Sequence, residues 1–277
     1  MTAAEAMSAA TARLRAAGVP DPARDARLLL AHAAQVDAAR VTLIAPEDIA
    51  PEIEERYDQL ISLRAVRVPV SHLIGERAFY GRAFKISGDV LDPRPETEAL
   101  IDAALTEDFA RVLDLGTGSG CILITLLAER ATAQGVGVDL SEAACLQASA
   151  NAVLHMVQDR LQVLRSDWFD AVGGRFDLIV ANPPYIAASE MAALDPEVRN
   201  HEPRLALTDE GDGLSAYRLI AAHAGGFLTA QGRVLCEIGH RQGPDVAAIF
   251  DQEGWGEVTI LPDLGGQDRV FLARNPA

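Results

Sequence analysis

From residue 111 to the end of the chain, short apolar runs alternate with longer stretches of helical periodicity. Strands separated by helices form βαβ units, whose parallel sheet is covered by helices on both faces. The last two runs are too close together for a crossover helix, so they should pair as an antiparallel hairpin. The sequence therefore predicts an α/β fold with a seven-stranded, mostly parallel, Rossmann-like sheet. The predicted strands span residues 111–115, 135–138, 161–164, 176–181, 233–238, 258–261 and 269–273.

The residues before this sheet follow a different pattern. Residues 1–68 have helical periodicity, and two helix starts are marked by a proline after Asp21 and by Pro51. Proline suits the first helical position because its missing N–H has no partner there. Residues 69–90 alternate loosely between apolar and other side chains, which predicts a β-hairpin. We thus expect a small helical domain at 1–68, a hairpin linker at 69–90 and an α/β domain at 91–277.

The composition of the chain narrows the range of partners and compartments. The 277 residues are 49% hydrophobic, which is ample for a packed core, and the formal net charge is −16. A chain this acidic gains little from counterion release on a phosphate backbone, so no direct nucleic-acid partner is expected. The three cysteines lack metal-ligand spacing, and no apolar run approaches the roughly 20 residues that span a bilayer. We expect a cytoplasmic monomer with no metal and no membrane contact.

A glycine-rich turn separates the first predicted strand of the sheet from its helix. In open α/β sheets, ligands bind at the C-terminal ends of the strands, and glycines let the backbone approach them closely. The dinucleotide fingerprint needs a sixth-position glycine, but Cys121 stands there, so a pyrophosphate cradle is not favoured. The candidate cofactor-binding residues of this turn are Asp114, Gly116, Thr117, Gly118, Ser119 and Gly120.

Polar or aromatic residues also follow the next two strands. Asp139 comes about 20 residues after the turn, where an acid can accept hydrogen bonds from a ribose diol. Asp167 could accept from an exocyclic amine, and Trp168 could stack on an adenine. Taken singly, Asp139 could be a helix N-cap and Asp167 a turn residue. Suitable groups at three successive strand ends favour a cofactor that contains a nucleoside.

The fourth strand ends in Asn182-Pro183-Pro184-Tyr185. The two prolines remove backbone donors, so the Asn182 side-chain oxygen and the Pro183 carbonyl remain as rigid acceptors. Two acceptors suit an NH2 group, and Tyr185 offers a flat face for a planar amide or base. A conjugated nitrogen is a poor nucleophile, and fixed acceptors favour its partly positive transition state. We predict direct transfer of a methyl group to a planar nitrogen, with the methyl carbon in line with the nitrogen and about 3–3.5 Å from it. The predicted catalytic residues are Asn182, Pro183 and Tyr185.

These features together resemble the class I S-adenosylmethionine-dependent methyltransferases that act on amino nitrogens. Three further stretches resemble the subgroup that methylates a glutamine of peptide chain release factors. They are LDPRPETE at 91–98, HEPRLAL at 201–207 with Gly213, Leu214 and Tyr217, and Glu237-Ile238-Gly239 with Gln242. Asp92 stands where that family usually has isoleucine. The resemblance covers nearly the whole chain.

The resemblance implies a substrate, the glutamine of the Gly-Gly-Gln motif in class-1 release factors, and S-adenosylhomocysteine as the second product. It also implies that residues 1–68 help to recognise the substrate and that residues 91–277 bind the cofactor. By position, Asn182 would contact the cofactor as well as the glutamine. The implied substrate-binding residues are Asn182, Pro183, Pro184, Tyr185, Arg94, Pro95 and Glu96.

The sequence leaves two alternative functions open. An adenine-N6 methyltransferase acting on nucleic acid would share the Asn-Pro-Pro-Tyr sequence, but it should carry a basic or aromatic-rich recognition region, which the charge disfavours. An adapter that only binds the cofactor would not need Asn182. The chain also contains its own Gly-Gly-Gln at residues 265–267, where two glycines between strands predict an ordinary turn and not a site of self-methylation.

Overall fold

The computed structural model describes residues 1–275, which form two compact units. The N-terminal unit comprises Met1–Glu76 together with Asp195–His201. The sheet unit comprises Arg77–Leu194 and the chain from Glu202 onward. The N-terminal unit thus contains a short segment from much later in the chain. The predicted division at residues 68 and 90 assigns that segment to the α/β domain.

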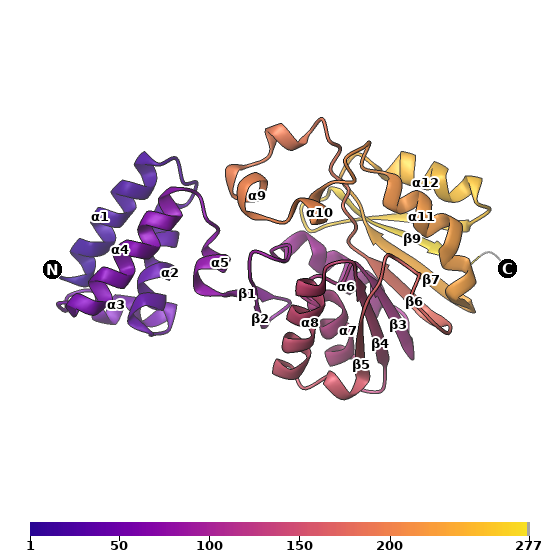
Figure 1. The fold of residues 1–277 in the computed structure, drawn as a ribbon, viewed down its shortest axis with the longest axis horizontal. Helices are drawn as coiled ribbons and strands as arrows, with labels where there is room; N and C mark the ends of the chain where they lie inside the picture. Colours follow the sequence, from indigo (N-terminus) through magenta and orange to yellow (C-terminus); the bar gives the residue numbers. More distant parts are fainter. Residues whose placement is uncertain (276–277) are drawn as a thin grey trace. The chain divides into compact units, whose positions relative to one another are not determined.

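The N-terminal unit is helical (Figure 1). Pro22 and Pro51 stand at the first positions of their helices, as predicted. The first helix begins with a capping box, in which the Thr2 hydroxyl accepts from the Glu5 amide and the Glu5 carboxylate accepts from the Thr2 amide. The elements are α1 (Ala3–Ala16), α2 (Pro22–Ala34), η1 (Ala38–Arg40), α3 (Val41–Ile44), α4 (Pro51–Ala65), α5 (Val70–Ile74) and α9 (Pro196–His201).

Charged side chains fasten the 195–201 segment to the N-terminal unit. Glu197 of α9 accepts hydrogen bonds from Arg64 at 2.9 Å and from Arg67 at 2.7 Å. The Arg64 side chain is only 6% exposed and also donates to Asp25 at 2.7 Å. Arg64 thus has two carboxylate partners in a buried setting, and the loss of Glu197 would leave its guanidinium with one partner fewer.

The prediction of a hairpin over residues 69–90 is wrong at its start. Val70–Ile74 form helix α5, which ends at Gly75 in the left-handed conformation. The apolar residues at 70, 73 and 74 have helical spacing as well as loose alternation, so the pattern is ambiguous. The hairpin itself is shorter and consists of β1 (Glu76–Phe79) and β2 (Arg82–Lys85).

The sheet unit contains the predicted seven-stranded sheet, in the order β5-β4-β3-β6-β7-β9-β8. Its first five strands along the chain are parallel, and β9 runs antiparallel to both of its neighbours. The chain builds outward from β3 to one edge and then returns to β6, so the switch point lies between these two strands. The strands are β3 (Arg111–Leu115), β4 (Gln134–Asp139), β5 (Leu161–Arg165), β6 (Phe176–Ala181), β7 (Leu228–Glu237), β8 (Gly256–Pro262) and β9 (Asp268–Arg274).

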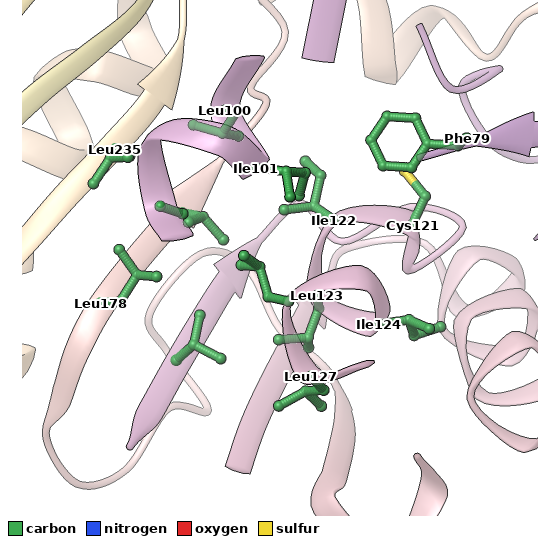
Figure 2. Packing of buried hydrophobic residues seen from close by; sticks show 14 of the residues in the cluster. Phe79, Leu100, Ile101, Cys121, Ile122, Leu123, Ile124, Leu127, Leu178 and Leu235 are labelled. Atoms are coloured by element: carbon green, nitrogen blue, oxygen red, sulfur yellow. The ribbon is translucent and has the colours of Figure 1, made fainter. Parts of the chain in front are cut away.

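Helices cover the sheet on both faces, so most side chains of the central strands β3 and β6 are apolar and buried. Leu178 and Leu235 pack in one cluster with α6 and α7, as Figure 2 shows. Their neighbours Ile179 and Val234 point the other way, into a cluster with α11 and α12. The elements outside the sheet are η2 (Pro95–Thr97), α6 (Glu98–Leu105), α7 (Cys121–Glu129), α8 (Glu142–Leu154), η3 (Gln158–Arg160), η4 (Met191–Ala193), α10 (Arg204–Leu207), α11 (Ser215–His223), η5 (Ala224–Phe227) and α12 (Gly243–Gln252).

No helix among residues 1–275 combines the length and the apolar character that a membrane crossing requires. The Gly-Gly-Gln at 265–267 lies in the loop between β8 and β9, with Gly266 at a φ of 76°. It is therefore the turn that the sequence predicts.

Candidate active site

A cleft opens in the sheet unit at the C-terminal ends of β3, β4 and β6. Its empty volume is about 1150 Å³, open solvent at the mouth included. The cleft is lined by the glycine turn, Asp139 and Asn182 from the strand ends, and also by Arg94 and Leu205. The switch point between β3 and β6 thus coincides with the cleft, as expected for an open α/β sheet.

The glycine turn combines open backbone with one tightly packed position. The amides of Gly116 and Thr117 both donate to the Val138 carbonyl at 2.9 Å, which ties the turn to β4. At Gly120, where φ is 80°, an added Cβ would lie 2.8 Å from Ile124. Gly116, Thr117, Gly118 and Ser119 line the cleft. Gly120 does not line the described cleft. Close packing against Ile124 accounts for a glycine at this position, and its contact with the cofactor stays a prediction.

Asp114 lies beneath the turn and is fully buried. One carboxylate oxygen accepts from the Thr117 hydroxyl at 2.7 Å, and the other has no partner among the described residues. Burial raises the pKa of Asp114 to about 7, against the opposing hydrogen bond from Thr117 and with a smaller contribution from the charge of Asp139. Asp114 is not among the residues that line the cleft. Its direct cofactor contact therefore stays a prediction, whereas its support of Thr117 is visible.

The second and third strand ends both reach the cleft. Asp139 accepts hydrogen bonds at 2.9 Å from the amides of Gly118 and Ser141, one on each oxygen. A carboxylate has about four acceptor positions, so Asp139 keeps capacity for two ribose hydroxyls. Asp167 and Trp168 line the cleft as predicted by position, and the Ser166 hydroxyl fixes the Trp168 carbonyl at 3.0 Å.

The Asn182–Tyr185 segment is anchored from behind. Asn182 and Pro184 line the cleft, whereas Pro183 is buried. The Tyr185 hydroxyl donates to the buried Glu237 carboxylate at 3.3 Å. Tyr185 is absent from the described lining, so its proposed stacking on a substrate stays a prediction.

Gln242 and Gly213 come from two of the stretches that resemble the family, and both contact the backbone at Tyr185. The Gln242 side chain donates to the Tyr185 carbonyl at 2.9 Å and accepts from the Gly239 amide at 2.9 Å. An added Cβ at Gly213 would lie 2.3 Å from the Tyr185 oxygen. Both residues therefore hold the backbone that follows Asn182.

Arg94 lines the cleft and lies close to buried acids. Its guanidinium pairs with Glu202, whose side chain is 1% exposed. Burial raises the pKa of Glu202, and the neighbouring Arg94 opposes that shift. Asp92, the departure from the family pattern, is buried with Arg77 at 3.7 Å, so its charge has a partner. Pro95 and Glu96 are exposed and do not line the described cleft, and their substrate contacts stay predictions.

Several residues of the site were not predicted as such. In the sequence, four of them stand out only because they belong to stretches that resemble the family: Thr97, Glu202, Glu237 and Gln242. Their partners lie far away in the chain, so no local pattern indicates their contacts. Residues 1–275 contain no cluster of three or more His, Cys, Asp or Glu side chains placed to hold a metal ion.

Two family models match the sequence. The PrmC N-terminal domain model matches residues 5–75, and the methyltransferase small domain model matches residues 86–200. The chain is 55% identical to the release factor glutamine methyltransferase of Cereibacter sphaeroides over 277 residues, all of both chains. It is 43% identical to the enzyme of the same name from Agrobacterium fabrum, covering 96% of this chain and 95% of that one.

Solved methyltransferase structures superpose on this chain at low sequence identity. The catalytic domain of hMettl16, in complex with MAT2A 3'UTR hairpin 6, superposes with a TM-score of 0.60 at 18% identity. That match covers 79% of this chain and 82% of the other. A methyltransferase from Pyrococcus furiosus superposes with a TM-score of 0.56 at 14% identity, over 72% and 92%. At these identities the likeness concerns the fold alone.

Proposed function

Because the chain belongs to the family of release factor glutamine methyltransferases, we propose that it methylates the glutamine of the Gly-Gly-Gln motif in class-1 release factors. The acceptor atom is the side-chain amide nitrogen, the donor is S-adenosylmethionine, and the second product is S-adenosylhomocysteine. The observation that carries this function is the 55% identity to a release factor glutamine methyltransferase along the entire length of both chains.

The cleft fits the proposed cofactor. Asp139 is fixed at the wall with acceptor capacity left for a ribose, and Trp168 offers an aromatic face beside it. The glycine turn presents backbone without side chains at Gly116 and Gly118. Bound there, S-adenosylmethionine would supply an electrophilic sulfonium methyl group. Asp114 would support the turn by accepting a hydrogen bond from Thr117, and Gly120 would allow the turn to pack closely against Ile124.

The chain's own residues prepare the amide. The Asn182 oxygen and the Pro183 carbonyl accept one amide hydrogen each, which aligns the NH2 group and stabilises positive charge as it develops on nitrogen. The backbone that carries both acceptors is pinned by Gln242 through the Tyr185 carbonyl. Fixed acceptors cost no reorganisation during the reaction, which is why a poor nucleophile can react here. The remaining substrate contacts fall to Pro184, Tyr185, Arg94, Pro95 and Glu96.

The adenine alternative is not retained. The relatives that match the whole chain are named release factor glutamine methyltransferases, and the likeness to the RNA-bound hMettl16 domain rests on 18% identity. We further propose that the chain acts as a cytoplasmic monomer without metal or direct nucleic-acid contact, and that residues 1–68 contribute to release factor recognition.

A substrate panel tests the function. The purified chain is incubated with radiolabelled S-adenosylmethionine and one of three substrates: a class-1 release factor, the same factor with alanine in place of the motif glutamine, or adenine-containing DNA. Label should transfer to the unaltered factor alone. Equal labelling of the alanine variant, or labelling of DNA alone, would contradict the proposal.

A further inference from the structure

Two buried polar residues near Asn182 have no part in the chemistry described so far, and one of them, Thr97, also lines the cleft. Thr97 is 2% exposed and Glu237 is 1% exposed, and neither comes from the strand that carries Asn182. The Thr97 hydroxyl donates to the Glu237 carboxylate at 2.6 Å. A buried carboxylate is costly unless it is hydrogen-bonded, so this pair requires a reason for being there.

Thr97 does not have the usual role of a threonine at the start of a helix, which is to cap the helix with its hydroxyl. Thr97 is the N-cap residue of α6, where threonine ordinarily accepts a hydrogen bond from a backbone amide of the first turn. No such side-chain cap bond is formed at α6 within the described chain. The hydroxyl is directed at Glu237 instead, and its oxygen faces Asn182 at 3.4 Å.

The direction of these hydrogen bonds decides which end of the Asn182 amide reaches the cleft. Both oxygens of Glu237 accept, one from the Thr97 hydroxyl and the other from the Tyr185 hydroxyl, so the hydroxyl proton of Thr97 is committed to Glu237. Burial raises the pKa of Glu237, and these two hydrogen bonds and the charge of Arg269 oppose that shift. The Thr97 oxygen can then only accept from Asn182, and the atom that donates must be the amide nitrogen. The amide oxygen is left free for the substrate.

We propose that Thr97 and Glu237 are positioning residues that lock the amide of Asn182 with its oxygen toward the substrate nitrogen. The reversed amide would present an NH2 group to the NH2 group of the glutamine, donor against donor. The inference rests on the proposed function, because it assigns these two residues to the acceptor role of Asn182.

The surroundings of Glu237 keep it in place. Its second carboxylate oxygen accepts from the Tyr185 hydroxyl at 3.3 Å, and its backbone carbonyl accepts from the buried Tyr217 hydroxyl at 2.8 Å. The contact between Asn182 and Thr97 is long at 3.4 Å. Catalytic hydrogen bonds are often long before substrate binds, and this one is expected to shorten in the complex.

Threonine variants separate the hydroxyl from the packing. Thr97→Val keeps the shape and removes the donor, and it should lower kcat about 10- to 100-fold while the KM for the release factor stays within about threefold. Thr97→Ser restores the hydroxyl and should restore most of kcat. Thr125→Val is the matched control, because Thr125 is equally buried and its hydroxyl has no hydrogen-bond partner within residues 1–275.

A double-mutant cycle with Asn182→Ala distinguishes positioning from general structural damage. If Thr97 acts through Asn182, Thr97→Val should lower kcat by less than about twofold once the asparagine amide is gone. Glu237→Gln provides a second route, because a glutamine NH2 can donate to Thr97 and so release the hydroxyl proton toward Asn182. This variant should also lose kcat with a preserved melting temperature.

The outcomes are distinct. Near-normal kcat in Thr97→Val, loss of kcat in Thr97→Ser equal to that in Thr97→Val, or an undiminished effect of Thr97→Val in the Asn182→Ala background would each overturn the inference. If Thr97→Val fails to fold, Glu237→Gln still decides the matter, because near-normal kcat in that variant would overturn the inference. An unaltered chain that does not methylate the release factor would instead refute the proposed function.

Discussion

At the scale of single residues, the acceptor role of Asn182 is the chemical centre of the account. The side chain lines the cleft at the end of β6 and donates a hydrogen bond to Thr97 at 3.4 Å. Its oxygen is the one side-chain acceptor that the mechanism requires at the substrate amide. Removing it should therefore cost catalysis and leave the fold intact.

Asn182→Ala is expected to lower kcat by about 10² or more, the cost typical of one lost preorganised group. Steady-state kinetics with a release factor as substrate measure this, and the melting temperature serves as the control. Turnover near that of the unaltered chain would remove the acceptor role.

Asp114 yields a prediction about stability and pH. Burial raises its pKa to about 7 in the folded chain, so the folded state binds this proton more tightly than the unfolded state does. The stabilisation is present in full below the ordinary pKa of an aspartate and is lost as the pH rises through about 7. Asp114→Asn removes the titration and can still accept from Thr117.

The melting temperature of Asp114→Asn, relative to the unaltered chain, should therefore increase between mildly acidic and mildly alkaline pH. Thermal melts of both proteins without cofactor, measured across this range, test the expectation. Parallel pH curves for the two proteins would show that Asp114 does not titrate as described.

At the scale of elements, β3 and β6 were predicted with the bounds they have, because most of their residues are apolar and buried. Strand β7 begins at Leu228, five residues before its predicted start, because its first half is less apolar and partly exposed. The ends of β3 and β6 placed the glycine turn and Asn182 correctly at one edge of the sheet. Helix α5 was missed because its apolar spacing also fits a strand. The pairing of Thr97 with Glu237 joins distant parts of the chain and leaves no local trace in the sequence.

The loop that follows Asn182 depends on Gly213. Gly213→Ala should impair catalysis about tenfold or more, because the added methyl group would meet the Tyr185 carbonyl at 2.3 Å. Gly266→Ala is the control, since Gly266 has the same φ of 76° but nothing lies within 4 Å of its added Cβ. The control should lose only about 1–2 kcal/mol of stability and keep its kcat. Equal kinetic effects of the two variants would contradict the role given to this contact.

At the scale of the whole molecule, two compact units share one chain that crosses between them more than once. The relatives match both units over their full length, so helical domain and methyltransferase sheet occur together in the family. The sequence indicated a helical N-terminal part but not the return of residues 195–201 to it. That return depends on Arg64 and Arg67, whose partner Glu197 lies more than a hundred residues away.

Glu197→Ala should lower the free energy of unfolding of the N-terminal unit by about 1.5–3 kcal/mol, because Arg64 is left buried with one carboxylate partner fewer. Glu210→Ala is the comparison, since Glu210 pairs with Arg204 while both side chains are more than half exposed. An exposed pair of this kind contributes about 0–1 kcal/mol. Urea unfolding of the two variants should show the larger loss for Glu197, and similar losses would contradict the network described for this unit.

The chain methylates one particular atom, the amide nitrogen of the motif glutamine in a release factor. The most direct measurement is fragmentation mass spectrometry of a class-1 release factor after incubation with the purified chain and S-adenosylmethionine. A single methyl group on the side chain of the Gly-Gly-Gln glutamine, absent when Asn182→Ala replaces the unaltered enzyme, is the predicted result. A methyl group on any other residue, or none on this glutamine, would contradict the account.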